Sequence, residues 1–100
     1  MLDDIKRRLA TFTEQEIILT THAQAQAMFR GGLIREVKEN IINPRSLSYA
    51  IRQEARKAGE EKYDCYFGYS KTQCHRYILV LTEKCVVCTI IKIKEMASDC

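Results

Sequence analysis

Three polar residues spaced four apart, His22, Gln26 and Arg30, form the part of the sequence best suited to chemistry. If residues 21–30 form a helix, this spacing places the three side chains in one stripe along it. His22 then stands in the first turn, where unpaired backbone N–H groups and the helix dipole disfavour a protonated imidazole. A neutral imidazole can remove a proton, and the same helix end, including Thr21, can bind a phosphate. Arg30, about 12 Å further along the helix axis, is a candidate phosphate clamp.

The second histidine of the chain, His75, is a candidate partner for His22. Two histidines suit RNA cleavage through the 2′-hydroxyl, because one removes its proton and the other protonates the leaving oxygen. His75 begins a predicted strand beside Arg76, and neighbouring strand residues point to opposite faces, so the two cannot share one cleft. Further candidate phosphate or RNA contacts are Thr21, Gln26, Arg76 and Lys92.

A structural interpretation competes with the catalytic one at each of these positions. His22 can satisfy backbone groups at the start of a helix, and Arg30 can cap its last carbonyls. His75 can be a structural residue at the end of a strand. The residue types alone leave both interpretations open.

Cysteine usage indicates the compartment and argues against a metal site. Five cysteines behind an N-terminus without an apolar block indicate a reducing compartment, so we expect a cytoplasmic protein with buried thiols. Cys85 and Cys88 have the spacing of half a zinc site. Val86 and Val87 between them belong to a strand-like run, in which residues three apart face opposite sides. We therefore expect no metal and no other cofactor.

Hydrophobic periodicity and capping residues predict three helices in the first half of the chain. They cover residues 2–10, 21–30 and 34–42, and the last ends before Asn43-Pro44 because proline disfavours helix at the preceding residue. The predicted inward positions are Leu2, Ile5 and Leu9 in the first helix, Ala25, Met28 and Phe29 in the second, and Ile34, Val37, Ile41 and Ile42 in the third.

Short runs rich in β-branched and aromatic residues predict strands over 16–20, 46–52, 63–70, 75–82 and 85–94. In the run over 63–70, one face is predicted to carry Tyr63, Cys65, Phe67 and Tyr69. Tyr66 lies on the other face, where an exposed ring could stack a nucleic-acid base. We expect one α+β domain over residues 1–100, with an N-terminal helix over 1–11 and a core over 16–94.

Charge and hydropathy narrow the possible partners. The net charge of +3 permits contact with RNA or an acidic protein without requiring either. The apolar runs are far shorter than the ~20 residues that a membrane span needs, so we expect no membrane contact.

The segment LTTHAQAQAMFRGG resembles the opening of a small domain-of-unknown-function family, which has a strand, a T-x-H-A motif and a helix ending in Arg-Gly. The resemblance extends over about residues 16–94. Gln26 and Gly32 depart from the family, which often has a second basic residue and an apolar residue there. The matching residues are Thr20, His22, Ala23, Arg30, Gly31, Val37, Asn43 and Pro44.

The element order is also similar to that of RelE/ParE-like toxins, which implies N-terminal helices packed on a curled antiparallel sheet of four to five strands. Many proteins of that group cut RNA, often on the ribosome, and a small antitoxin protein inhibits them. The resemblance therefore implies an active cleft that contains His22 and Arg30, assisted by His75 or a lysine of the last strand.

Three hypotheses follow from the sequence. The first is a metal-independent endoribonuclease of toxin type, with mRNA as a candidate substrate. In it His22 is the base or a phosphate ligand, Arg30 clamps the phosphate and His75 is the acid. The alternative is a non-catalytic module that binds RNA or a protein. The third is a structural homo-oligomer, such as a homodimer, that associates through an exposed strand edge.

Overall fold

The computed structural model describes residues 2–29, 33–68 and 73–94, which form three helices and five strands. The helices are α1 (Leu2–Ala10), α2 (Thr21–Phe29) and α3 (Leu33–Ile42), with short 3-10 turns η1 (Glu14–Glu16) and η2 (Pro44–Ser46). The strands are β1 (Ile17–Leu19), β2 (Leu47–Gln53), β3 (Glu61–Gly68), β4 (Gln73–Leu81) and β5 (Cys85–Lys94). The predicted element order and the α+β class are confirmed, and the described bounds agree with the predicted ones within two residues.

All five strands belong to one sheet in the order β1-β5-β4-β3-β2. Strands β2 to β5 form an antiparallel meander, as their short connections require. Strand β1 pairs with β5 in parallel, with Ile17 opposite Cys85, so the sheet is mixed rather than wholly antiparallel as expected. Parallel pairing is possible here because a long connection over residues 20–84, which includes helices α2 and α3, lies between these two strands.

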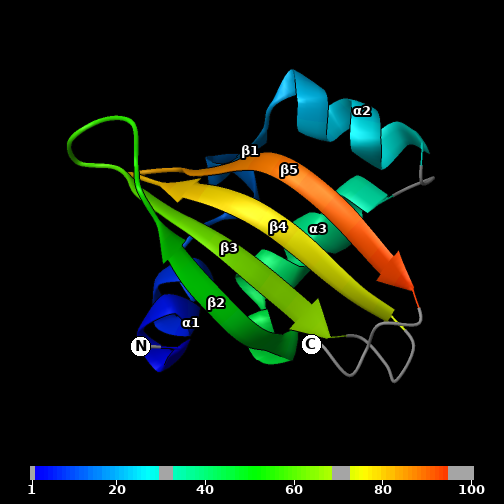
Figure 1. Cartoon of the computed structure of the whole chain (residues 1–100), viewed down its shortest axis with the longest axis horizontal. Coiled ribbons are helices and arrows are strands. Elements are labelled where there is room, and N and C mark those ends of the chain that lie inside the picture. Colours follow the sequence, from blue (N-terminus) through cyan, green and yellow to red (C-terminus); the bar gives the residue numbers. More distant parts are fainter. Residues whose placement is uncertain (1, 30–32, 69–72, 95–100) are drawn as a thin grey trace.

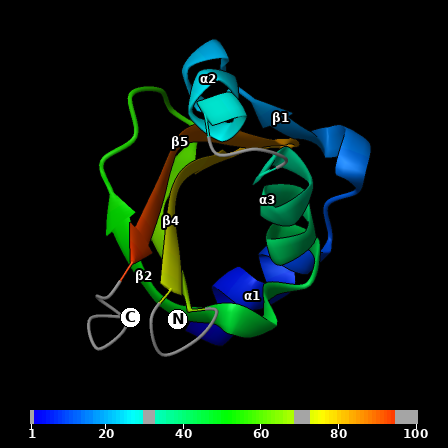
Figure 2. The same cartoon turned by 90° about the vertical axis from the view of Figure 1, so that its right-hand side faces the viewer.

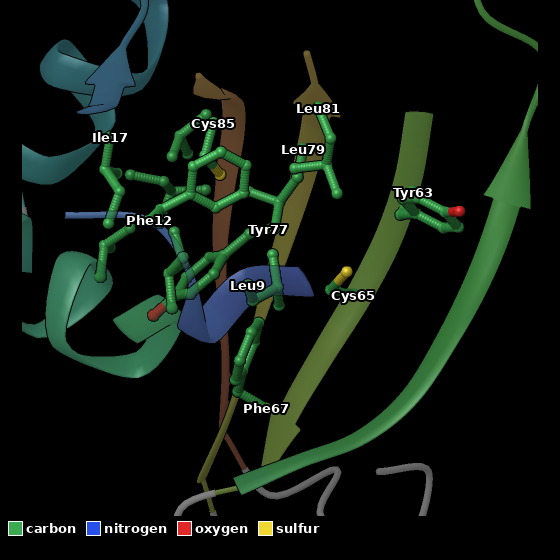
Figure 3. Close-up of a cluster of buried hydrophobic side chains, with 14 of the residues drawn as sticks. Leu9, Phe12, Ile17, Tyr63, Cys65, Phe67, Tyr77, Leu79, Leu81 and Cys85 are labelled. Carbon is green, nitrogen blue, oxygen red and sulfur yellow. The ribbon is translucent and has the colours of Figure 1, made fainter. Parts of the chain in front are cut away.

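The sheet curls, and helices α1 and α3 lie on its concave side (Figure 2). Side chains from both helices and from all five strands meet there in one hydrophobic cluster (Figure 3). Its largest fully buried members include Tyr77, Phe67, Leu9 and Ile41. The opposite, convex side faces the viewer in Figure 1, and no described helix covers it.

Helix α2 lies along the edge of β5 rather than on a face of the sheet (Figure 1). Strand β1 pairs with β5 only as far as Val87, so the next residues of β5 would otherwise present unpaired backbone groups. The hydroxyl of Thr20 donates to the Cys88 carbonyl oxygen at 3.2 Å, and the Ile90 N–H donates to Gln26 Oε1 at 2.8 Å. The side chains of Thr20, directly before α2, and of Gln26 within it thus replace the missing neighbouring strand.

This placement corrects the predicted inner face of α2. Ala23 and Ala27 are buried, because their small side chains let the helix approach the strand closely. Ala25 is exposed and Met28 is 77% exposed, whereas both were expected to face inward. The N-cap prediction is confirmed at Thr20, whose Oγ1 accepts the Ala23 N–H at 3.1 Å.

Two irregularities in the sheet register change which residues face the core. One lies in β2 between Leu47 and Tyr49, and the other lies opposite Ile78 and Leu79 of β4, where Cys88 is the extra residue of β5. Each extra residue moves the side chains that follow it to the other face.

Among the described residues, no helix has the length and apolar character that a bilayer crossing requires.

We predict that Gln26→Ala lowers the free energy of unfolding by about 1 kcal/mol, because the Ile90 N–H loses its acceptor at the edge of β5. Chemical denaturation monitored by circular dichroism measures the change. Gln15→Ala, at an exposed position in η1, is the matched control and should leave stability unchanged. Equal stability of the two variants would contradict the edge-protecting role of Gln26.

Candidate nucleic-acid interface

The first turn of α2 presents His22 and Thr21 to solvent. Thr20, directly before them, is fixed to β5 by its N–H bond to the Val87 carbonyl at 3.0 Å. His22 therefore stands near Val87, in the first half of β5, and is accessible to a substrate. This position is compatible with the predicted role of His22.

His75 lies in the interior and is only 1% exposed. Its Nδ1 is 2.8 Å from the Tyr77 hydroxyl, which also accepts a hydrogen bond from Asn40 Nδ2 at 2.8 Å. This buried network joins β4 to α3, and Figure 3 shows the Tyr77 hydroxyl directed toward that helix. The expectation that His75 serves as the catalytic acid is corrected here, because a sealed imidazole cannot reach a substrate.

The structure does not bring the two histidines together. His75 pairs with Lys92 in β5, whereas α2 begins beside Val87. Five strand residues separate these points, which corresponds to roughly 16 Å at about 3.3 Å per residue. Arg30, the third predicted catalytic residue, lies outside the described residues.

The remaining predicted phosphate contacts are divided between different parts of the molecule. Gln26 is partly buried, and its side-chain oxygen is occupied by the Ile90 N–H, which corrects its predicted role. Lys92 is half-buried on the face of the sheet that carries His75. Arg76, by contrast, lies on the convex face, as the alternation of strand residues predicted.

The register of β2 to β5 assembles a set of side chains on the convex side, which we call the open face. Three rows across the strands define it. The open face consists of Tyr49, Tyr66, Arg76 and Ile91 in one row, Ile51, Asp64, Ile78 and Thr89 in the next, and Gln53, Lys62, Val80 and Val86 in the third.

Tyr49 and Tyr66 form an aromatic pair on this face. Their ring centroids are 5.7 Å apart with an angle of 47° between the planes, and Tyr49 is 52% exposed. The Arg76 guanidinium lies 5.3 Å from the centre of the Tyr66 ring, within the range of a cation–π contact. The pair offers stacking surface that is already held in place.

Asp64 fixes the Arg76 guanidinium beneath this pair. Arg76 Nε is 2.8 Å from Asp64 Oδ1, and Nη2 is 2.5 Å from Oδ2, so the contact is bidentate. The Asp64 carboxylate is 2% exposed, and its hydrogen bonds raise the pKa of Arg76. Because the charge of Arg76 is balanced by Asp64, we revise its predicted role from phosphate contact to positioning the Tyr66 ring.

A hollow of about 390 Å³ adjoins the open face, between the loop over 54–60 and the strands β3 to β5. Arg56, Lys57 and Lys62 supply three positive charges to its lining, and Glu60 supplies one negative charge, which leaves an excess of two positive charges. Val80 and Val86 form an apolar wall together with the Cys88 side chain. The hollow is therefore both cationic and partly apolar.

Cys88 contributes a thiol to the lining of this hollow. Desolvation raises the pKa of its thiol, and Glu60 also raises that pKa, whereas Lys62 and Arg56 lower it. Cys65 and Cys85 are buried thiols, and burial raises the pKa of each to about 12. Cys85 thus faces the core while Cys88 faces the hollow, as their strand positions predicted. Within the described part of the chain, no three potential metal-ligating side chains gather.

A second polar cluster joins α1 to the first residue of β3 and to Thr82, the residue that follows β4. The Arg8 guanidinium pairs with the Glu61 carboxylate and also donates to the Thr82 carbonyl oxygen at 3.2 Å. Tyr63 donates to Glu61 at 3.2 Å. The Arg8 hydrogen bond lowers the pKa of Glu61, which makes its carboxylate a weaker base. We interpret this cluster as the attachment of α1 to the sheet.

Reasoning from the sequence identified Tyr66 as a stacking residue but missed Tyr49, Arg56, Lys57 and Lys62. Strict alternation from Leu47 places Tyr49 in the core, and the bulge between them reverses this. The three cations occupy a polar loop and a half-solvated strand, where such residues are common. The signal that could have identified these cations was the pair Arg56-Lys57 close to Lys62 in the sequence.

No protein-family model matches the chain, and neither the curated proteins nor the solved structures contain a significant match to it. The functional argument therefore rests on the geometry of the described residues.

We predict that Tyr77→Phe lowers the free energy of unfolding by about 1–3 kcal/mol, because Asn40 and His75 each lose a buried hydrogen bond. Thermal and chemical unfolding provide the measurement. Tyr49→Phe, which removes the same atom from an exposed ring, should have no such effect. A Tyr77→Phe variant as stable as the parent protein would contradict the structural role assigned to this network.

Proposed function

We propose that the protein is a single-stranded RNA-binding module and that RNA lies across the open face. The observation that carries this proposal is the Tyr49–Tyr66 pair, which is held by Arg76 on an uncovered sheet surface beside a cationic hollow. Aromatic side chains and cations together satisfy the two chemical parts of a single strand, its bases and its phosphates.

Stacking supplies the first part of the interaction. Tyr49 is half-exposed, so one base can cover its ring without displacing other side chains. Base–aromatic stacking contributes about 1–3 kcal/mol per base and tolerates any base, because every base has a π face. The neighbouring Ile51, 40% exposed, extends the apolar surface along the same strand.

Charge supplies the second part. Lys62 and Tyr66 lie on one face of β3, four residues apart, which spans roughly 13 Å. A backbone that runs from the aromatic pair along β3 therefore reaches Lys62 and then the cations of the 54–60 loop. The net charge of +3 favours the approach of a polyanion.

The first test is a binding titration of a fluorescent single-stranded RNA in low salt, followed by anisotropy. Tyr49→Ala should weaken the Kd by about tenfold or more, because one stacking contact is lost. Tyr49→Phe keeps the ring and should bind like the parent protein.

Met28→Ala, at a 77% exposed position on α2, is the control for loss of a large exposed side chain and should not change the Kd. Saturable binding that is insensitive to Tyr49→Ala would refute the assignment of RNA to the open face. Absence of saturable binding would refute the module itself.

A second candidate function, metal-independent RNA cleavage of the toxin type, is favoured by the exposure of His22 on the first turn of α2. In this reaction His22 removes the proton from a ribose 2′-hydroxyl. The 2′-oxygen then attacks the adjacent phosphorus, and the 5′-oxygen leaves with a proton from solvent. The resemblance to RelE/ParE-like toxins supports this reaction and a small antitoxin protein as partner.

Expression in a heterologous host tests this second candidate. Growth arrest with fragmented RNA is the expected result, and His22→Ala should relieve both effects, because it removes the base. Gln15→Ala serves as a control that leaves the first turn of α2 unchanged. Purified protein should cut RNA in the presence of a chelator and leave a 2′-deoxy substrate intact. Normal growth and intact RNA with the parent protein would exclude the nuclease.

A further inference from the structure

The hollow beside the open face has the size and composition of a small-ligand site. Its volume of about 390 Å³ lies within the range of about 300–1,000 Å³ that is typical of ligand pockets. The loop over 54–60 forms one side, and its chain reversal is closed by the Glu60 N–H bond to the Lys57 carbonyl at 3.3 Å. Gly59 permits this turn with a φ of +84°.

The two kinds of lining residue are separated within the hollow. Arg56 and Lys57 come from the loop, while Val80 and Val86 come from β4 and β5, where they are direct partners in the sheet. Lys62 extends from β3 opposite Val80 and therefore lies at the boundary between the charged and the apolar parts. A ligand that fills this space must carry a negative charge at one end and a flat or apolar group at the other.

The half-buried Cys88 side chain lines the same hollow as Arg56, Lys57 and Lys62. The three cations therefore border the space beside this thiol. Glu60 opposes them with one charge, so a singly charged carboxylate gains less here than a phosphate, whose charge approaches two.

We propose that the hollow binds one nucleoside monophosphate unit, with the base against Val80 and Val86 and the phosphate among Arg56, Lys57 and Lys62. The inference deepens the proposed RNA-binding function and rests on it for its biological context. The unit can belong to an RNA strand or to a free nucleotide, and both sources share the same chemistry.

Protection of Cys88 from alkylation is the test. The purified protein is treated with iodoacetamide near pH 9, where more of the thiol is ionised, in the presence of 5′-AMP, adenosine, inorganic phosphate or a short oligoadenylate. Trypsin releases residues 85–92, and fragment spectra separate Cys88 from the buried Cys85, which should stay unlabelled. We expect 5′-AMP and the oligoadenylate to slow labelling of Cys88 severalfold, and adenosine and phosphate to slow it less.

Charge-matched variants show whether the hollow itself binds. Arg56→Gln with Lys57→Gln should abolish protection by 5′-AMP, whereas Arg35→Gln with Lys38→Gln on α3 should leave it unchanged. Isothermal titration of 5′-AMP into the same proteins repeats the comparison without depending on thiol reactivity. Equal loss in both double variants would overturn the proposal, because binding would then reflect net charge alone.

The outcomes also separate this inference from the proposed function. Protection by the oligoadenylate alone assigns the unit to RNA, and protection by 5′-AMP shows that free nucleotides enter as well; either result supports the site. Saturable RNA binding in the anisotropy assay with no protection of Cys88 by any probe overturns the nucleotide site only. Protection by 5′-AMP without RNA binding overturns the RNA-binding function only.

Discussion

The described helices of this small domain cover only one face of its sheet, and the rest of the structure depends on that constraint. Helices α1 and α3 occupy the concave side, and α2 protects the edge of β5. Burial of apolar area on the concave side supplies the main favourable free energy of folding. The described side chains of the convex side are therefore shielded mainly by one another, and they include most of the residues to which we assign a binding role.

The buried ion pair of Asp64 and Arg76 makes this uncovered face orderly. A carboxylate with 2% exposure is costly unless a cation and good hydrogen-bond geometry compensate it, and the bidentate Arg76 contact provides both. The same contact holds the guanidinium against the Tyr66 ring, which in turn contacts Tyr49. The Asp64–Arg76 ion pair on the sheet thus determines how the tyrosine rings are oriented toward solvent.

Local patterns in the sequence were sufficient for the elements but not for the site. Capping at Thr20, the Asn43-Pro44 stop and period-two alternation in β3 act over a few residues, and all three agree with the structure. The exposure of Tyr49 depends on a bulge, and the buried partner of His75 is the Tyr77 hydroxyl, which Asn40 binds from 37 residues away in the chain. The hollow joins a loop to three strands through their register, which no local pattern encodes.

Because α2 covers the edge of β5, it also limits where a second copy of this fold can pair with the sheet. The described sheet has β1 and β2 at its borders, and β1 is three residues long, whereas β2 has seven residues. Strand addition needs a long row of unsatisfied backbone groups, and β2 is the longer of these two borders. Two molecules that paired through β2 would consume that row in both, so growth by this route would end at a closed pair rather than continue as a fibre.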